Sequence, residues 1–168
     1  MTRARTVVAA LALSLLAAGC YQNGRFDPSA LTVITPSCSV VHDLAGRLTA
    51  MINAAHADGV ALLPETKSYL PPGSPEPPRN ESCYRSYELQ QWWRVYYCSI
   101  NQCAFAAVPG TSRHGWGRAV DFEDQLGKLT FDSPGYAWLK AHAAAYGFVH
   151  PAWAEPGGSS PEPWHWEA

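Results

Sequence analysis

The stretch that decides the fold of this chain is residues 112–121, SRHGWGRAVD, and it is complemented near the C-terminus by residues 162–165, EPWH. Together they contain two imidazoles, one carboxylate that can bind a metal and a second carboxylate that can act as a base. A catalytic zinc site needs three protein ligands, an open position for water and a general base. The two stretches therefore predict a hydrolytic zinc site, and we expect the reaction to be amide hydrolysis.

The spacing of His114 and Asp121 depends on the two glycines between them, Gly115 and Gly117. Glycine permits a tight turn, so the two side chains can converge on one ion. Imidazole nitrogen and carboxylate oxygen are both zinc ligands. Alone, the same spacing also fits a buried histidine–aspartate hydrogen bond or a surface turn.

Glu162 and His165 lie in a proline-rich context that excludes a helix interior, because Pro161 and Pro163 flank the glutamate. On a regular strand, an offset of three residues places two side chains on opposite faces. Both can reach one metal ion only if the backbone bends between them, and Pro163 is positioned to allow this. The alternative is an ordinary C-terminal strand whose tryptophans pack in the core.

The N-terminal residues have the features of an export signal. Two arginines precede an apolar run over residues 7–18, which is too short to span a bilayer. Cys20 follows Leu-Ala-Ala-Gly, which resembles a bacterial lipobox with its leucine one position too far away. We expect a signal peptide at 1–19, a lipid anchor on Cys20, an irregular tether at 20–37 and a location in the cell envelope. The alternative is a secreted form.

The charge balance excludes a nucleic-acid partner. Without residues 1–19 the chain keeps 149 residues, with ten basic and fourteen acidic side chains and a net charge of −4. No basic surface of the kind that binds nucleic acid remains. That length suffices for one domain that buries roughly 70% of its unfolded surface. We expect a monomer with one catalytic domain at 38–168.

Four cysteines follow Cys20, namely Cys38, Cys83, Cys98 and Cys103. An even number in an exported chain favours two disulfides. Of the three possible connectivities we favour Cys98–Cys103, which closes a short loop, with Cys38–Cys83 joining distant segments. A zinc cluster is the competing interpretation, but the sequence has no C-x-x-C pair.

Apolar spacing and capping residues predict the secondary structure. A helix is expected over residues 39–57, and further helices begin after Ser86 and Ser133, which are suitable N-caps. Residues 118–123 alternate as a strand does. The proline-rich stretch 64–79 is expected to be a surface loop. Helices interleaved with short strands indicate an α+β domain, but the order of the strands stays open.

Three motifs in a fixed order make a family resemblance specific. Residues 82–90 fit S-x-Y-R-S-Y-x-x-Q, residues 112–121 fit S-x-H-x-x-G-x-A-x-D, and residues 162–165 fit E-x-W-H. The set resembles the bacterial D-alanyl-D-alanine carboxypeptidase family of zinc peptidases, which includes the vancomycin-resistance enzymes and shares its fold with the hedgehog signalling domain. The resemblance covers roughly residues 38–168. It implies a hedgehog/DD-peptidase-like α+β fold, with a small antiparallel sheet packed with helices.

The resemblance also implies roles for the residues of the motifs. His114, Asp121 and His165 are the expected ligands of Zn²⁺, and Glu162 is the expected catalytic base. The implied substrate is the stem peptide of peptidoglycan.

Three further polar residues receive implied roles. Arg85 matches the arginine that stabilises the oxyanion, and Ser112 and Gln90 match polar positions near the substrate. The proline-rich insert before Ser82 and the four cysteines are not general to the family.

Several other functions compete with a zinc D,D-carboxypeptidase. A serine hydrolase could use Ser112, but this serine does not lie in G-x-S-x-G. A cysteine peptidase could use Cys83 or Cys103, provided that the thiol is free. A non-catalytic peptidoglycan-binding module has no need of Glu162. Within the same fold, an L-alanyl-D-glutamate endopeptidase is the main alternative.

Overall fold

The computed structural model describes residues 21–168. The predicted signal peptide at 1–19 and the predicted lipidation site at Cys20 lie outside these residues. Within the described part, no helix combines the length and the apolar character needed to cross a bilayer.

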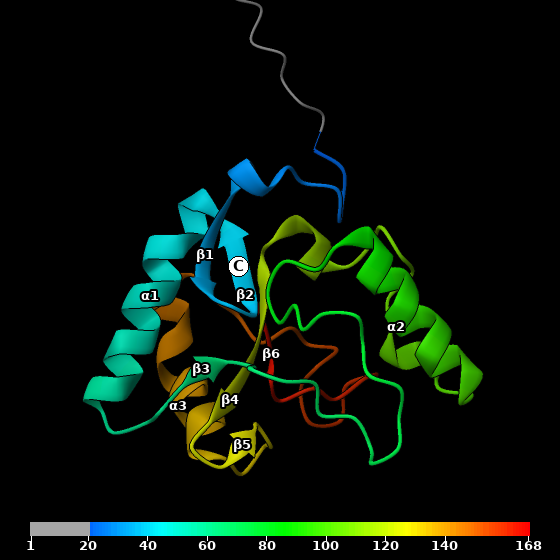
Figure 1. Ribbon diagram of the computed structural model, residues 1–168. Helices are drawn as coiled ribbons and strands as arrows, with labels where there is room; N and C mark the ends of the chain where they lie inside the picture. The colour runs from blue at the N-terminus through cyan, green and yellow to red at the C-terminus, as the bar shows by residue number, and fades with distance from the viewer. Residues whose placement is uncertain (1–20) are drawn as a thin grey trace, which may run out of the picture.

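Three α-helices and two small antiparallel sheets make up the described chain (Figure 1). The helices are α1 (His42–Ala57), α2 (Tyr87–Ser99) and α3 (Pro134–His142), and the strands are β1 (Leu31–Thr35), β2 (Cys38–Val41), β3 (Leu63–Pro64), β4 (Ala119–Asp124), β5 (Gly127–Lys128) and β6 (His165–Glu167). Short 3₁₀ helices are η1 (Pro28–Ala30), η2 (Cys103–Phe105), η3 (Arg113–Trp116) and η4 (Ala143–Tyr146). This arrangement confirms the predicted α+β fold.

Strand β4 is the centre of the larger sheet. It pairs antiparallel with β3, β5 and β6, while β1 and β2 form a separate two-stranded sheet. All six residues of β4 are buried. Figure 1 shows α1 and α3 together on one side of β4 and α2 on the other, with the long loop between β3 and α2 beside it. The strand that holds Asp121 thus lies in the middle of the domain, with α1 and α3 on one side of it.

The hydrophobic core lies between α1, α3 and β4. The apolar positions of α1 recur at three- and four-residue steps, as a helix with one buried face requires. Aliphatic and aromatic side chains from all three elements and from β6 fill this core with little or no exposure to solvent. Its largest fully buried members include Leu44, Leu48, Met51, Phe122, Leu139 and Trp166.

The predicted starts of α2 and α3 and the predicted strand at 118–123 are confirmed. Ser86 caps α2, and its Oγ accepts a hydrogen bond from the backbone N–H of Leu89. Helix α3 begins with Pro134 after Ser133, as predicted. The Ser133 hydroxyl does not cap the helix, because it bonds to Thr130 instead. The predicted strand at 118–123 corresponds to β4.

The predicted helix at 39–57 begins too early. Residues 38–41 form β2, and α1 starts at His42. The β-branched Val40 and Val41 favour a strand, and β1 supplies the pairing partner, with Val40 opposite Thr32. Periodicity over the whole window did not reveal this boundary, because Val41 at the end of β2 also fits the three- and four-residue spacing of the helix.

The prediction of an irregular tether at 20–37 is also wrong for its second half. Residues 31–35 form β1 and pair with β2. Upstream, the backbone N–H of Gly24 donates to the carbonyl of Gly115 at 2.7 Å. These hydrogen bonds make the segment part of the domain, so the ordered domain begins well before residue 38.

Both favoured disulfides are present, Cys38–Cys83 and Cys98–Cys103. The first joins β2 to the segment that precedes Arg85 across 45 residues of sequence, and the second closes a loop of five at the end of α2. A cysteine nucleophile at Cys83 or Cys103 is thereby excluded.

The long-range disulfide should contribute more stability than the short one. In the chain-entropy picture, closure of 45 residues stabilises by about 4 kcal/mol and closure of five by about 2 kcal/mol. We expect Cys38→Ala/Cys83→Ala to lower the free energy of unfolding more than Cys98→Ala/Cys103→Ala. Urea denaturation of both double variants measures this, and equal losses would contradict it.

Candidate functional site

The backbone around His114 is shaped by a short helix and a left-handed glycine. The Oγ of Ser112 accepts a hydrogen bond from the His114 N–H at 3.2 Å and caps η3. Gly117 ends η3 with φ of 63°, a conformation that residues with a Cβ adopt rarely. The chain then enters β4, which places Asp121 beside His114.

Gly115 is required for a different reason, which is close approach. A Cβ at this position would lie 1.8 Å from Oδ1 of Asn23. Asn23 is buried, and its Nδ2 donates to the carbonyl of Ser112 at 2.7 Å. The N-terminal segment therefore braces the histidine loop, and this contact depends on glycine.

His165 reaches the same place from the last strand. The carbonyl of Glu162 accepts a hydrogen bond from the His165 N–H at 3.0 Å, which closes a turn at Pro163. This turn is the bend that the sequence required. Strand β6 then pairs with β4 so that His165 lies directly opposite Asp121.

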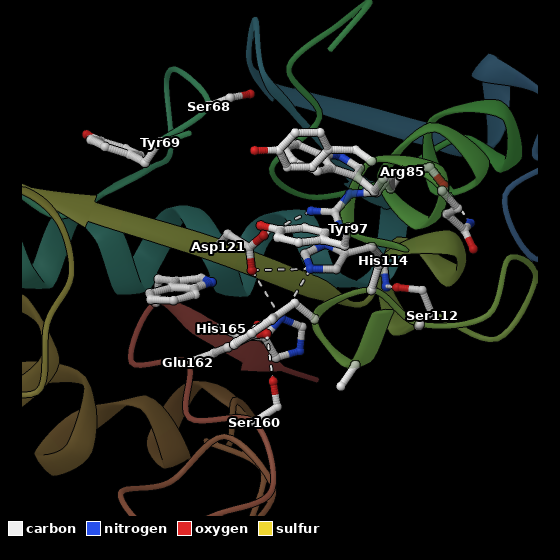
Figure 2. A pocket seen from close by; sticks show the side chains of 18 of the residues that line it. Ser68, Tyr69, Arg85, Tyr97, Ser112, His114, Asp121, Ser160, Glu162 and His165 are labelled. Atoms are coloured by element: carbon white, nitrogen blue, oxygen red, sulfur yellow. Dashed lines mark hydrogen bonds and ion pairs between the residues drawn. The ribbon is translucent and has the colours of Figure 1, made fainter. Parts of the chain in front are cut away.

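His114, Asp121 and His165 form one buried cluster (Figure 2). Oδ1 of Asp121 lies 3.0 Å from Nδ1 of His165 and 3.2 Å from Nε2 of His114. The two nitrogens are 3.1 Å apart. Figure 2 shows all three side chains directed toward one another.

The other ring nitrogens of the two histidines have acceptors of their own. Nδ1 of His114 lies 2.7 Å from the carbonyl of Cys83, and Nε2 of His165 lies 3.1 Å from Oε1 of Glu167. Each acceptor holds a ring proton on the outer nitrogen, so the inner nitrogens are the atoms that would present lone pairs to a metal ion. Two such nitrogens and one carboxylate oxygen are a donor set that fits Zn²⁺ with a fourth position open.

The electrostatics of the cluster also favour a cation. Burial lowers the pKa of His114 to about 4, which keeps its imidazole neutral. Burial opposes protonation of His165 as well, but hydrogen bonds to Asp121 and Glu167 outweigh it and raise the pKa to about 9, so a metal ion would have to displace the proton on Nδ1. Burial raises the pKa of Asp121, yet the two histidines hold it well below the usual range. The centre therefore contains an ionised carboxylate that attracts positive charge.

Substitution of Glu167 directly tests whether its carboxylate orients the His165 ring. Outer partners of metal-binding histidines typically contribute about 10–100-fold to metal affinity. We expect Glu167→Gln to weaken zinc binding by a factor in this range while the protein stays folded. Competition titration with a chromophoric chelator measures the affinity. An unchanged dissociation constant would show that Glu167 does not orient the ring.

Arg85 lies against the outer oxygen of Asp121. Its Nη2 donates to Oδ2 of Asp121 at 3.0 Å, and its backbone N–H donates to the carbonyl of His114 at 3.0 Å. Within residues 21–168, its Nε is buried without a hydrogen-bond partner. The guanidinium lines the cavity beside the cluster, so it retains donors for another group.

Gln90 and Ser112 both line the cavity, but Gln90 is fully engaged with protein groups. Its Nε2 donates to Oδ1 of Asn23 and to the carbonyl of Arg85, and its Oε1 accepts from the Gly110 N–H. These bonds hold the Arg85 backbone in place. The contact of Gln90 with the site is thus indirect.

Glu162 lies beside His165 in Figure 2 and lines the same cavity. Burial raises the pKa of its carboxyl group, which the charge on His165 partly offsets. Ser160 Oγ donates to Oε1 of Glu162 at 3.3 Å. His150, which is buried, contacts the carbonyl of Glu162 through Nε2 at 3.0 Å. The glutamate is held on both its side chain and its backbone.

The cluster opens into a cavity of about 660 Å³. One wall comes from the 64–79 insert and another from the aromatic residues of α2 and η2. Sequence reasoning missed several lining or supporting residues, including Glu65, Tyr97, Trp153 and Glu167. Only Glu167 had a usable signal, because it lies two residues after His165 and so shares its face of the strand.

Glu65 is expected to make the stability of the folded protein depend on pH. Burial raises its pKa to about 8, against the opposing effect of Lys128. Between its ordinary value of 4.5 and about 8, the folded state binds the proton and the unfolded state does not, so stability falls as pH rises. Urea denaturation from pH 5 to 8.5 should show this fall, reduced in Glu65→Gln. Parallel curves for the two proteins would contradict it.

Comparisons with solved structures identify the fold of this chain. The fold resembles the solved structure of VanYB in complex with D-alanine-D-alanine, at 25% identity and a TM-score of 0.60, over 82% of this chain and 75% of that one. It also resembles the E175A mutant of the D,D-pentapeptidase VanY in complex with Zn(II), at 26% identity and a TM-score of 0.59, over 82% and 76%. The LD-carboxypeptidase LdcB shares the fold at 23% identity, with a TM-score of 0.63 over 86% and 70%. The chain thus has the hedgehog/DD-peptidase fold.

The sequence then gives the family. The profile of VanY, D-alanyl-D-alanine carboxypeptidase, matches residues 77–167, which is more than half of the chain. No curated protein matches the sequence. The chain belongs to the VanY family of peptidoglycan peptidases, as the three motifs indicated.

Proposed function

We propose that this protein is a zinc-dependent D-alanyl-D-alanine carboxypeptidase that removes the terminal D-alanine from peptidoglycan stem peptides. The observation that supports this most is the convergence of three ligand atoms from His114, Asp121 and His165, with Glu162 in the same cavity. A binding module would not need a half-buried glutamate beside a metal site. A serine hydrolase is disfavoured, because Ser112 caps η3 and accepts the His114 N–H.

The three clustered residues would hold Zn²⁺ through Nε2 of His114, Oδ1 of Asp121 and Nδ1 of His165. Their outer partners fit this assignment, because each histidine already directs its other nitrogen to an acceptor. When bound, zinc polarises a scissile carbonyl and lowers the pKa of water toward about 7.

Glu162 is proposed to move the proton. A half-buried carboxylate beside the metal site accepts a proton from the attacking water and delivers it to the leaving amine. Burial raises its pKa above the ordinary value, which makes the carboxylate a stronger base. The hydrogen bond from Ser160 and the contact from His150 hold the group in place.

Arg85 is proposed to stabilise the negative charge that develops on the carbonyl oxygen. Asp121 takes one Nη of the guanidinium, which leaves the remaining N–H groups for the substrate. One such donor is typically worth about 2.7–4 kcal/mol in the transition state. The ion pair with Asp121 also keeps the guanidinium beside the reacting bond.

Muropeptides distinguish the proposed activity from the alternatives of the same fold. Purified pentapeptide and tetrapeptide muropeptides are incubated with the zinc-loaded protein, with and without chelator, and products are identified by mass spectrometry. We expect loss of one alanine from the pentapeptide only, abolished by chelator. Cleavage after L-alanine would indicate an endopeptidase, loss of D-alanine from the tetrapeptide an L,D-carboxypeptidase, and no chelator-sensitive product a binding module.

A further inference from the structure

A carboxylate and an ammonium with unused hydrogen-bonding capacity face the same cavity as the proposed catalytic residues. Oε1 of Glu65 lies 3.8 Å from Nζ of Lys128, which is beyond hydrogen-bond distance. The Glu65 side chain is only 9% exposed, and its Oε1 has no hydrogen-bond partner in the described part of the chain. Burial of a polar atom without a hydrogen-bond partner is costly, and a donor from a ligand in the cavity would satisfy it.

Glu65 lies directly across the sheet from Asp121. The antiparallel register pairs Leu63 with Glu123 and Pro64 with Phe122, and the Glu65 N–H donates to the carbonyl of Asp121 at 2.8 Å. Opposite residues of an antiparallel pair point to the same face, with Cβ atoms roughly 4.5–5.5 Å apart. A peptide bound at the Asp121 cluster therefore has a neighbouring side chain within reach of Glu65.

Lys128 is fixed in place without being saturated. Its Nζ lies 3.5 Å from the centre of the Trp164 ring, a cation–π contact that holds the ammonium against the cavity wall. Within the described residues, none of its three N–H donors makes a hydrogen bond to a protein acceptor. The group is thus positioned to bind a carboxylate from a ligand.

The neighbouring carboxylate on β4, Glu123, is already used. Glu123 accepts from Oγ1 of Thr66 and from the hydroxyl of Tyr69, both at 2.7 Å. These bonds pin the insert to β4, and Figure 2 shows Ser68 and Tyr69 at the edge of the cavity. Glu65 and Lys128 are left as an acidic and a basic group that both line the cavity and make no side-chain hydrogen bond within the described residues.

We propose that Glu65 and Lys128 form a subsite for a zwitterionic amino-acid end, namely the free ammonium and carboxylate at the end of a diaminopimelate side chain in the stem peptide. Glu65 takes the ammonium, and Lys128 takes the carboxylate. The inference rests on the proposed function, because it names the class of stem peptide that the same cavity accepts. A lysine side chain supplies only the ammonium, which leaves Lys128 unpaired beside a like charge.

The test compares three pentapeptides that differ only at the third position, which holds meso-diaminopimelate, L-lysine or Nε-acetyl-L-lysine. For the zinc-loaded wild type, we expect kcat/KM to be at least about tenfold higher for the diaminopimelate peptide than for the lysine peptide, because unpaired polar groups penalise the analogue. Lys128→Met should bring the two peptides within about twofold of each other. Glu65→Gln should remove the preference for lysine over acetyl-lysine.

Two exposed residues of the same insert provide matched controls. Lys67→Met and Glu76→Gln change the same residue types outside the cavity and should keep both wild-type preferences, for diaminopimelate over lysine and for lysine over acetyl-lysine. Thermal unfolding of each variant establishes that it is folded. Equal turnover of the diaminopimelate and lysine peptides by the wild type, or an undiminished preference in Lys128→Met, would overturn the proposed subsite.

A binding measurement separates this inference from the proposed activity. Calorimetry with the tripeptide products, L-Ala-γ-D-Glu linked to diaminopimelate or to lysine, reports the preference without turnover. If no peptide is cleaved but the diaminopimelate product binds at least about tenfold more tightly, the activity is wrong and the subsite stands. If cleavage occurs and the two products bind equally, the activity stands and the subsite is wrong.

Discussion

Glu162→Gln should keep its zinc and lose about 10²–10⁴-fold in kcat/KM for cleavage of D-alanyl-D-alanine, the range typical of a lost general base. Glutamine keeps the size of the side chain and can still accept the hydrogen bond from Ser160. It cannot take a proton from water. The predicted effect therefore falls on turnover, while metal content and fold stay unchanged.

Three measurements make this result decisive. Elemental analysis gives the zinc content, thermal unfolding gives the stability, and peptide hydrolysis gives kcat and KM. Glu76→Gln, an exposed glutamate on the insert, is the matched control and should retain wild-type rates. Near wild-type turnover of Glu162→Gln would remove Glu162 from the role of base. Loss of zinc together with activity would assign Glu162 to the metal site instead.

His165→Ala should lose both the metal and the activity. The substitution removes Nδ1 from the cluster and deprives the buried Asp121 of one of its partners. A missing ligand weakens binding by more than the roughly 10–100-fold expected for loss of an outer partner. We therefore expect less than stoichiometric zinc after dialysis and peptide hydrolysis at the background rate.

The exposed His142 on α3 supplies the control for this variant. His142→Ala removes the same functional group away from the cavity and should bind zinc as the wild type does. Zinc titration of both variants, followed by activity at saturating zinc, separates weak binding from lost chemistry. Stoichiometric, tightly bound zinc in His165→Ala would show that the metal lies elsewhere.

The sequence predicted the parts of the site that depend on local backbone geometry. The glycines before Asp121 predicted the turn after His114, and Gly117 adopts the left-handed conformation that such a turn needs. The bend at Pro163 was required for Glu162 and His165 to act together, and the turn is present. Local rules were sufficient at these positions because the constraint lies within a few residues of sequence.

Contacts between distant segments were beyond such rules. The carbonyl of Cys83 orients His114 across 31 residues of sequence. Every residue has a backbone carbonyl, so the residue type gives no indication of this contact. Residues 20–37 were expected to be an irregular tether, but the close approach of Asn23 to Gly115 makes this segment a support for the His114 loop. Gln90 was matched to the substrate region, whereas its amide is occupied by Asn23, Arg85 and Gly110.

The position of the 64–79 insert in the fold was also not predictable from local sequence. Its prolines predicted a loop correctly, but they did not reveal that the loop closes one wall of the cavity. That placement depends on Glu123, which binds Thr66 and Tyr69. The shape of this cavity wall thus depends on a tertiary contact that no local pattern encodes.

Crystals grown with Zn²⁺ and measured on both sides of the zinc absorption edge test the central claim most directly. The account predicts one strong anomalous peak within about 2.0–2.2 Å of Nε2 of His114, Oδ1 of Asp121 and Nδ1 of His165. An empty cluster with zinc bound only at other positions would contradict it.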